Sequence, residues 1–420
     1  MYLSKQVLKI TMFIFLIFFT VSAYPQTDDN HRTDDMNFKI IIYGPSDEIF
    51  IWWGHAALIV EYEYTDYVYS RVFDWGIFSY EGDNFIKEFI YDRVQYLCRA
   101  GLLNIQSYIY EDRDITIYNL DLDRKGKETI LSNVENNILP ENRYYDYHEF
   151  RDNCSTRIRD ILDLGTNGQF KAAFDSVTGR LTTRQHVRRF TWAKPFSDWA
   201  LDFLMGRDLD QKISVWDEMF LPVEIARNIV DFSYIDDLGI ERKLVSSVEI
   251  INSSKQRQPI LNAAFVTWPF VLPFGLIIAA ILFYIKNKEH KYKLTCRIIL
   301  GLSQSLLGLI LGALGCLLTI GLFFMNNDYI QQNINFLFVN PLLLIIFPLG
   351  IMAAINKPQK INPVKCLSIA WTCVFIACLV TVLLWLVPSF RQQNQSIVAL
   401  ILPISFALSC LPDKILRSLK

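Results

Sequence analysis

The chain has 420 residues, of which 52% are hydrophobic and 14% aromatic, and its formal net charge is -2. It is too long for one ordinary domain and too apolar for a wholly soluble protein, so we expect part of it to lie in a membrane. The near-neutral charge provides no basic field, and we expect no nucleic-acid partner.

Residues 1–23 have the pattern of a secretory signal peptide. Two lysines precede an apolar core at 10–20, and the small residues VSA at 21–23 form a cleavage site. The alternative is an uncleaved anchor, but this core is shorter than the about 20 residues that span a bilayer. The pattern therefore predicts that residues 24–260 form an exported domain.

Residues 261–420 have the pattern of an all-α membrane domain of about five helices. Apolar runs near spanning length cover 261–285, 298–324, 336–355, 366–387 and 396–411, the last being the shortest. Lys and Arg cluster after the first and third runs and in the tail, whereas the loop at 325–335 has neither. Because such clusters mark cytoplasmic loops, we expect the 24–260 domain to lie on the opposite side of the membrane.

Two of the eight cysteines, Cys98 and Cys154, lie in the predicted exported domain. A disulfide between them is one interpretation in an oxidising compartment. The sequence around Cys154, FRDNCSTRIRDILDLG, favours another, because it predicts a helix capped by Asn153 or Asp152. The apolar stripe of that helix is Ile158, Ile161 and Leu162, and Gly165 is expected to end it. Cys154 then lies in the first turn, where unpaired N–H groups and the helix dipole favour a thiolate, so we predict that it is a nucleophile.

A histidine interrupts the apolar strand pattern WWGHAALIVEY at 52–62. His55 shares one face of this predicted strand with Ala57 and Ile59, while Ala56 and Leu58 share the other. A core histidine with a satisfied hydrogen bond is the alternative. A nucleophilic thiol needs a base, however, and an imidazole on a strand that faces a helix start meets that need.

A third side chain is needed to orient the imidazole, and the next predicted strand, YVYSRVFDWG, offers candidates. Asp74 is our prediction, with Tyr67 and Tyr69 as alternatives. His148 is close to Cys154 in sequence and ranks below His55 as the base.

Four quoted stretches resemble the exported domain of the lipoprotein N-acyltransferases of the Bacteroides type: GHAALIVEY, VFDWGIFSYEGDNFIKEFI, YYDYHEFRDNCSTRIRDIL and DEMFLPVEIA. They cover most of residues 38–235. The order of histidine on a strand followed by cysteine at a helix start is similar to the permuted papain-like fold of lecithin:retinol acyltransferase relatives. The resemblance implies an α+β permuted papain-like domain followed by a transmembrane domain, in a multi-pass protein of the bacterial inner membrane whose catalytic domain is periplasmic.

The same resemblance implies acyl transfer from a phospholipid, through a Cys154 thioester, to the N-terminal amine of a diacylglyceryl-cysteine apolipoprotein. We expect Trp53, Gly54 and Asn153 near the dyad to bind substrate. Asn340, at the outer end of a membrane run, is expected to do the same, although polar residues there are ordinarily boundary markers. No cofactor is expected, nor a metal, since no paired CxxC or HxxEH spacing occurs. The rival functions are a membrane-anchored cell-wall cysteine endopeptidase and a non-enzymatic envelope assembly module.

Overall fold

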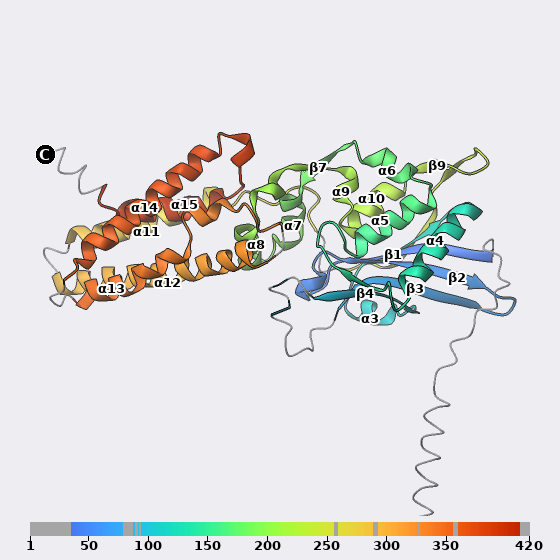
Figure 1. Ribbon diagram of the computed structural model, residues 1–420, viewed down its shortest axis with the longest axis horizontal. Coiled ribbons are helices and arrows are strands. Elements are labelled where there is room, and N and C mark those ends of the chain that lie inside the picture. Colours follow the sequence, from blue (N-terminus) through green and yellow to red (C-terminus); the bar gives the residue numbers. More distant parts are fainter. Residues whose placement is uncertain are drawn as a thin grey trace, which may run out of the picture.

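The computed structural model describes residues 35–78, 87–88, 91, 94–255, 259–288, 293–325, 328–355 and 360–411. The predicted signal peptide lies outside these residues, as does the basic tail. The described residues form an N-terminal α+β domain and a C-terminal helical domain, with two short helices, α7 and α8, between them (Figure 1). The helices are α7 (Thr183–Thr191) and α8 (Pro195–Leu204).

An antiparallel sheet of seven strands is the centre of the α+β domain, in the order β11-β5-β1-β2-β3-β4-β6. The strands are β1 (Met36–Tyr43), β2 (His55–Glu63), β3 (Val68–Ile77), β4 (Gln95–Leu102), β5 (Ile115–Leu120), β6 (Tyr144–Asp146) and β11 (Val245–Asn252). The inner strands are rich in Ile, Val and Tyr, whose branched or aromatic side chains suit a pleated surface.

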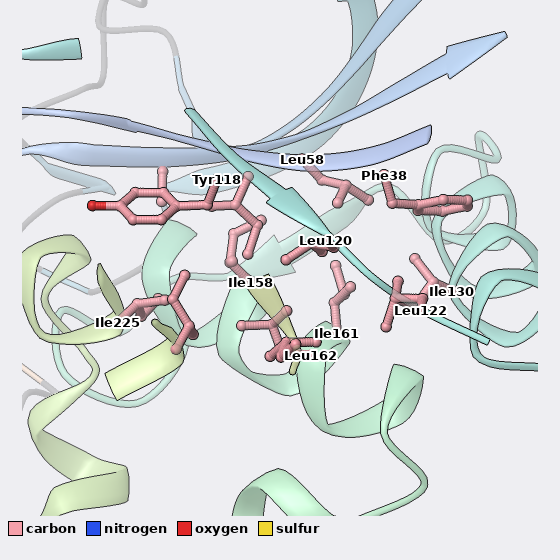
Figure 2. Close-up of a cluster of buried hydrophobic side chains, with 14 of the residues drawn as sticks. Phe38, Leu58, Tyr118, Leu120, Leu122, Ile130, Ile158, Ile161, Leu162 and Ile225 are labelled. Carbon is pink, nitrogen blue, oxygen red and sulfur yellow. The ribbon is translucent and has the colours of Figure 1, made fainter. Parts of the chain in front are cut away.

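One face of this sheet packs on helices and forms the main core. The helices on this face include α4 (Arg124–Asn137), α5 (Cys154–Gly165) and α10 (Pro222–Ile229) (Figure 1). Figure 2 shows side chains of the sheet, among them Leu58, above Ile158, Ile161 and Leu162 of α5. The predicted apolar stripe of α5 is therefore confirmed, and it fixes this helix against the sheet.

The other face of the sheet has a smaller core beneath α3 (Gln106–Tyr110). Ala57 and Ile59 contribute to this core, whereas Ala56 and Leu58 belong to the main core. The predicted alternation of β2 is thus confirmed.

Within the described residues of the C-terminal domain, four helical segments are long and apolar enough to cross a membrane. They are α11 (Trp268–Lys288), α12 (Lys293–Phe323), Ile334–Ile355 and α14 (Pro363–Leu384). The third consists of two short 3-10 segments followed by α13 (Ile346–Ile355). The expectation of about five spanning helices is corrected to four of spanning length and one shorter helix, α15 (Gln395–Leu408), because the fifth apolar run is helical over only 14 residues.

The shorter α15 nevertheless runs alongside α11. At one end, the hydroxyls of Thr267 and Ser396 are 2.6 Å apart, and at the other, Lys286 Nζ donates to the carbonyl oxygen of Ser409 at 3.0 Å. Side-chain hydrogen bonds therefore tie both ends of α15 to residues near the two ends of α11.

The loop at 325–335, which has no Lys or Arg, and the loop before α15, which has Arg391 alone, lie at the α+β end of the bundle. In the loop that follows α12, Asp328 pairs with His148 of the α+β domain, while Gln393 N donates to Asp210 from the loop before α15. Lys286 and Arg297 lie at the opposite end, next to Ser409 and Ala354. This arrangement agrees with the alternation of charge along the sequence.

A buried layer of amides joins the two domains. Asn333 and Asn335 each donate to the carbonyl oxygen of Phe203 at a distance of 2.9 Å. Gln392 donates to Asn333 at 3.1 Å and Asn394 donates to Asn335 at 2.8 Å. Because each of these buried amides has a partner, the layer holds α8 firmly against the bundle.

Candidate active site

Cys154 is the first residue of α5, as the sequence predicts. Asn153 caps the helix by accepting from Thr156 N at 2.9 Å, and Thr156 Oγ1 accepts from Asn153 N at 2.8 Å. The reciprocal pair is a capping box, which fixes the first turn. Asn153 Nδ2 also donates to the carbonyl oxygens of Glu149 and Phe220, so this side chain is engaged in holding the helix start.

His55 and Asp74 meet at one end of the sheet. His55 is the first residue of β2, and Asp74 lies one residue beyond Phe73, which pairs with Leu58 of β2. Because β2 and β3 are antiparallel, the start of one lies beside the end of the other. His55 Nε2 is 2.6 Å from Asp74 Oδ1, and the two side chains are 20% and 19% exposed. The pair is therefore sheltered but reachable from solvent.

The Cys154 thiol lies within hydrogen-bonding reach of the same imidazole. Burial acts to lower the pKa of His55, but the charges of Asp74 and Cys154, and hydrogen bonds to both, act to raise it. The effects of Asp74 and Cys154 together exceed the effect of burial, so the pKa of His55 lies well above its usual value of about 6.5. The surroundings thus favour the imidazolium form of His55.

Cys98 differs from Cys154 in its surroundings. Both are free thiols, so the disulfide interpretation is not supported. Cys98 is 2% exposed on β4, and burial, followed by the charge of Asp74, raises its pKa to about 12. A thiol with this pKa stays protonated near neutrality and is a poor nucleophile.

The structure separates the other sequence candidates from the dyad. Tyr69 pairs with Tyr62, which lies near the opposite end of β2 from His55. Tyr67 is exposed in the connection between β2 and β3. His148 Nε2 is 3.0 Å from Asp328 Oδ1, in the loop after α12. The structure thus selects Asp74 as the partner of His55, while the catalytic roles stay predictions.

The remaining predicted substrate-binding residues have structural partners. Trp53 Nε1 donates to the carbonyl oxygen of Val187, and its ring packs in the cluster beside α7. Gly54 has a φ of +87°, and a Cβ there would lie 2.7 Å from the carbonyl oxygen of Tyr43, so the close approach is to backbone. Asn340 caps a 3-10 turn of the helical domain by accepting from Leu342 N at 3.1 Å. Contact of any of these residues with substrate stays a prediction.

Three residues beside Cys154 were missed by the sequence analysis. Gly76 has a φ of +85° at an irregularity between β3 and β4, and the rings of Tyr145 and Tyr147 lie next to it. A glycine inside a strand pattern is a signal of a bulge or a close approach, and FDWG contains one. No local signal identifies the tyrosines, because only the fold brings β6 to this place.

Within the described residues, no group of three or more His, Cys, Asp and Glu side chains is arranged to hold a metal ion. The chemistry that the arrangement supports with its own groups is that of a thiol nucleophile with a general base and a carboxylate that orients it.

Comparison with known families gives a match over residues 23–189, to the family described as the Lnb N-terminal periplasmic domain. The match covers less than half of the chain but contains Cys154, His55 and Asp74. No curated protein and no solved structure matches the chain. Together with the four apolar helices, this similarity supports a membrane protein with a periplasmic domain.

Proposed function

We propose that the protein is a cysteine-dependent acyltransferase that N-acylates lipoproteins, taking its acyl chain from a phospholipid. The observation that carries this proposal is the His55 imidazole, which contacts both the Asp74 carboxylate and the Cys154 thiol at the start of α5. The match of residues 23–189 to the Lnb periplasmic domain favours the lipoprotein substrate suggested by the resemblance of the sequence.

In the first step, the Cys154 sulfur attacks the carbonyl carbon of a phospholipid ester. A C–S bond forms as the ester C–O bond breaks, and the His55 imidazolium gives its proton to the departing lysophospholipid oxygen. The products are a thioester on Cys154, a lysophospholipid and a neutral imidazole. Asp74 holds the ring in place and stabilises its protonated form.

The second step transfers the acyl group to the α-amine of a diacylglyceryl-cysteine. The amine nitrogen attacks the thioester carbon, a C–N bond replaces the C–S bond, and His55 accepts the proton from nitrogen. The thiolate and the imidazolium are then restored for another cycle. The helix start of α5 favours the thiolate as the group that departs.

The contact between the two domains favours substrates that are anchored in a membrane. Asp328 pairs with His148 and Arg151, and Tyr329 donates to Glu149 at 3.2 Å. These partners lie in the segment immediately before Asn153 and Cys154, so the bundle meets the α+β domain next to the nucleophile. A soluble hydrolase of cell-wall peptides has no need of such an arrangement.

We further propose that the α+β domain is a permuted papain-like fold. The histidine strand precedes the cysteine helix in the chain, and that helix packs across the sheet with its first turn toward the histidine. This order is the reverse of the cysteine-first order of papain-like enzymes.

Mass spectrometry of lipoprotein N-termini tests the proposed function. Cells that depend on the wild-type protein should carry an acylated N-terminal amine on diacylglyceryl-cysteine, and cells with Cys154→Ala should carry a free amine. Equal N-acylation in both strains would overturn the proposal. A change confined to cell-wall peptides would favour the endopeptidase instead.

A further inference from the structure

The hydroxyl of Tyr145 has no acceptor in the part of the chain that the structure describes. The residue lies in the short edge strand β6, opposite Tyr96 of β4, and eight residues later the chain reaches Asn153. The hydroxyl oxygen is buried and has no hydrogen-bond partner among the described residues. The backbone of Gly76 acts to lower the pKa of Tyr145, which is the effect of a donor near the phenol oxygen and gives the phenol hydrogen no acceptor. A buried hydroxyl without a hydrogen bond costs free energy and is uncommon in native proteins, which points to a functional role for Tyr145.

The unpartnered hydroxyl lies beside the predicted nucleophile. A carbon atom built as a side chain on Gly76 would lie 3.8 Å from Cys154 Cβ, 4.0 Å from Tyr145 Oη and 3.4 Å from Tyr147 Cε2. These are ordinary van der Waals distances, so the place beside Gly76 has room for one heavy atom. The φ of +85° disfavours any side chain at this position, and glycine therefore keeps the space open.

We propose that Tyr145 is an oxyanion-binding catalytic residue, whose hydroxyl donates a hydrogen bond to the substrate carbonyl oxygen when Cys154 attacks. This inference rests on the proposed function and adds a residue to it. As the C–S bond forms, the carbonyl oxygen gains negative charge, and a donor aimed at that place stabilises the tetrahedral intermediate. The N–H of Cys154, which lies in the first turn of α5 and has no acceptor within the helix, is the second donor.

Two features suit Tyr145 to this role. Burial, followed by the charge of Cys154, raises the pKa of Tyr145 well above its usual value, so the phenol keeps its proton throughout the working range of pH. The Arg157 guanidinium lies 4.4 Å from the centre of the Tyr145 ring and fixes its orientation from α5. The donor is therefore held in place before the substrate arrives.

The test compares two reactions of Cys154 in the purified full-length protein. Acylation by a phospholipid or by a p-nitrophenyl acyl ester passes through an oxyanion, whereas alkylation by iodoacetamide does not. In Tyr145→Phe, the kcat for acylation should fall by about 10²- to 10³-fold with KM changed less than twofold, the usual effect of losing one oxyanion donor. Alkylation of Cys154 should be unchanged, and the melting temperature should change little, since the phenol hydrogen has no acceptor among the described residues of the resting protein.

Tyr144→Phe is the matched control, because Tyr144 is the preceding residue of β6, is 49% exposed, and should leave acylation unchanged. Wild-type acylation rates in Tyr145→Phe would overturn the role of Tyr145 and leave the proposed function standing. Equal losses of acylation and alkylation would assign Tyr145 to support of the fold, which also overturns the inference. If the wild-type protein accepted acyl groups from neither donor, the proposed function and this inference would both fail.

Discussion

Two histidine–carboxylate pairs, one in the α+β domain and one on α7 between the domains, have similar distances and opposite surroundings. In one pair, His55 Nε2 is 2.6 Å from Asp74, and in the other, His186 Nε2 is 2.8 Å from Glu218. The His55 side chain is 20% exposed and contacts a thiol, whereas the His186 side chain is fully buried and its second nitrogen lies 3.2 Å from Arg189. The distance therefore does not distinguish the two histidines, whereas exposure to solvent and a neighbouring thiol do.

The buried pair belongs to a network that organises the region between the two domains. Glu218 accepts from Leu181 N at 2.9 Å, and Arg189 pairs with Glu224. On the same helix, Arg184 pairs with Asp202 and Asp210, both at the junction with the helical domain. These charges are buried but partnered, as buried charges must be. His186 is a core histidine whose hydrogen bonds are satisfied, which is the alternative that the sequence allowed for His55.

The largest expected difference between the two histidines is in catalysis. His55→Ala should slow formation of the Cys154 acyl adduct by ~10² to 10⁴, the usual range for general-base help, and change the melting temperature little. Rapid-quench mass spectrometry with a phospholipid donor measures this rate. An adduct formed at the wild-type rate would show that His55 is not the catalytic base, and the two pairs would then not differ in catalysis.

A smaller loss is expected from Asp74→Asn, which keeps the size of the side chain but removes its charge. We expect acylation near pH 7 to fall by roughly 10- to 100-fold, because the imidazolium is less stable. Since Asp74 raises the pKa of His55, the alkaline limb of the pH profile should lie well above pH 6.5 in the wild type and move down in the variant. An alkaline limb that did not move would contradict the assigned role of Asp74.

For His186→Ala the expected loss is in stability. The substitution removes one buried partner from Glu218 and one from Arg189, which keep Leu181 N and Glu224 respectively, and breaking such a buried network costs about 3 kcal/mol. For a domain of this size, we expect the apparent melting temperature in detergent to fall by roughly 5–10 °C. The acylation rate per folded molecule should stay within about threefold of the wild type, and a collapse of kcat in a stable variant would show that His186 has a direct role.

The smallest effect is expected from Cys98→Ala. This buried thiol is not bonded to Cys154, and its loss removes only a small side chain from the core. We expect a stability change of about 1 kcal/mol and acylation within about twofold of the wild type. Thiol counting under denaturing conditions, together with an activity assay, checks both points. An inactive Cys98→Ala with a Cys98–Cys154 disulfide in the wild type would restore the structural interpretation of both cysteines.

The sequence predicts the parts of this molecule that depend on local pattern. The apolar stripe Ile158, Ile161 and Leu162 and the cap at Asn153 define α5 within a residue of its observed ends. The alternation after His55 assigns the faces of β2, and four of the apolar runs become helices of spanning length. Each of these features depends on a period or a cap that a short window of sequence contains.

The parts that depend on long-range packing are less predictable. Strand alternation does not choose among Asp74, Tyr67 and Tyr69, because the choice needs the register of β2 with β3. The pairing of His148 with Asp328 joins residues 180 positions apart, and no local pattern indicates it. Trp53, Gly54 and Asn153 were expected to bind substrate; the structure gives each a backbone partner or a packing role, and their contact with substrate stays a prediction.

The most direct test of the central claim is to search for an acyl group on Cys154 in purified protein given phospholipid alone. We predict one added acyl chain, released by hydroxylamine, absent from Cys154→Ala, and transferred to a diacylglyceryl peptide with a free N-terminus but not to its N-acetylated form. Lysophospholipid that appears only when the amine is present, with no thioester trapped on Cys154, would contradict the proposed mechanism.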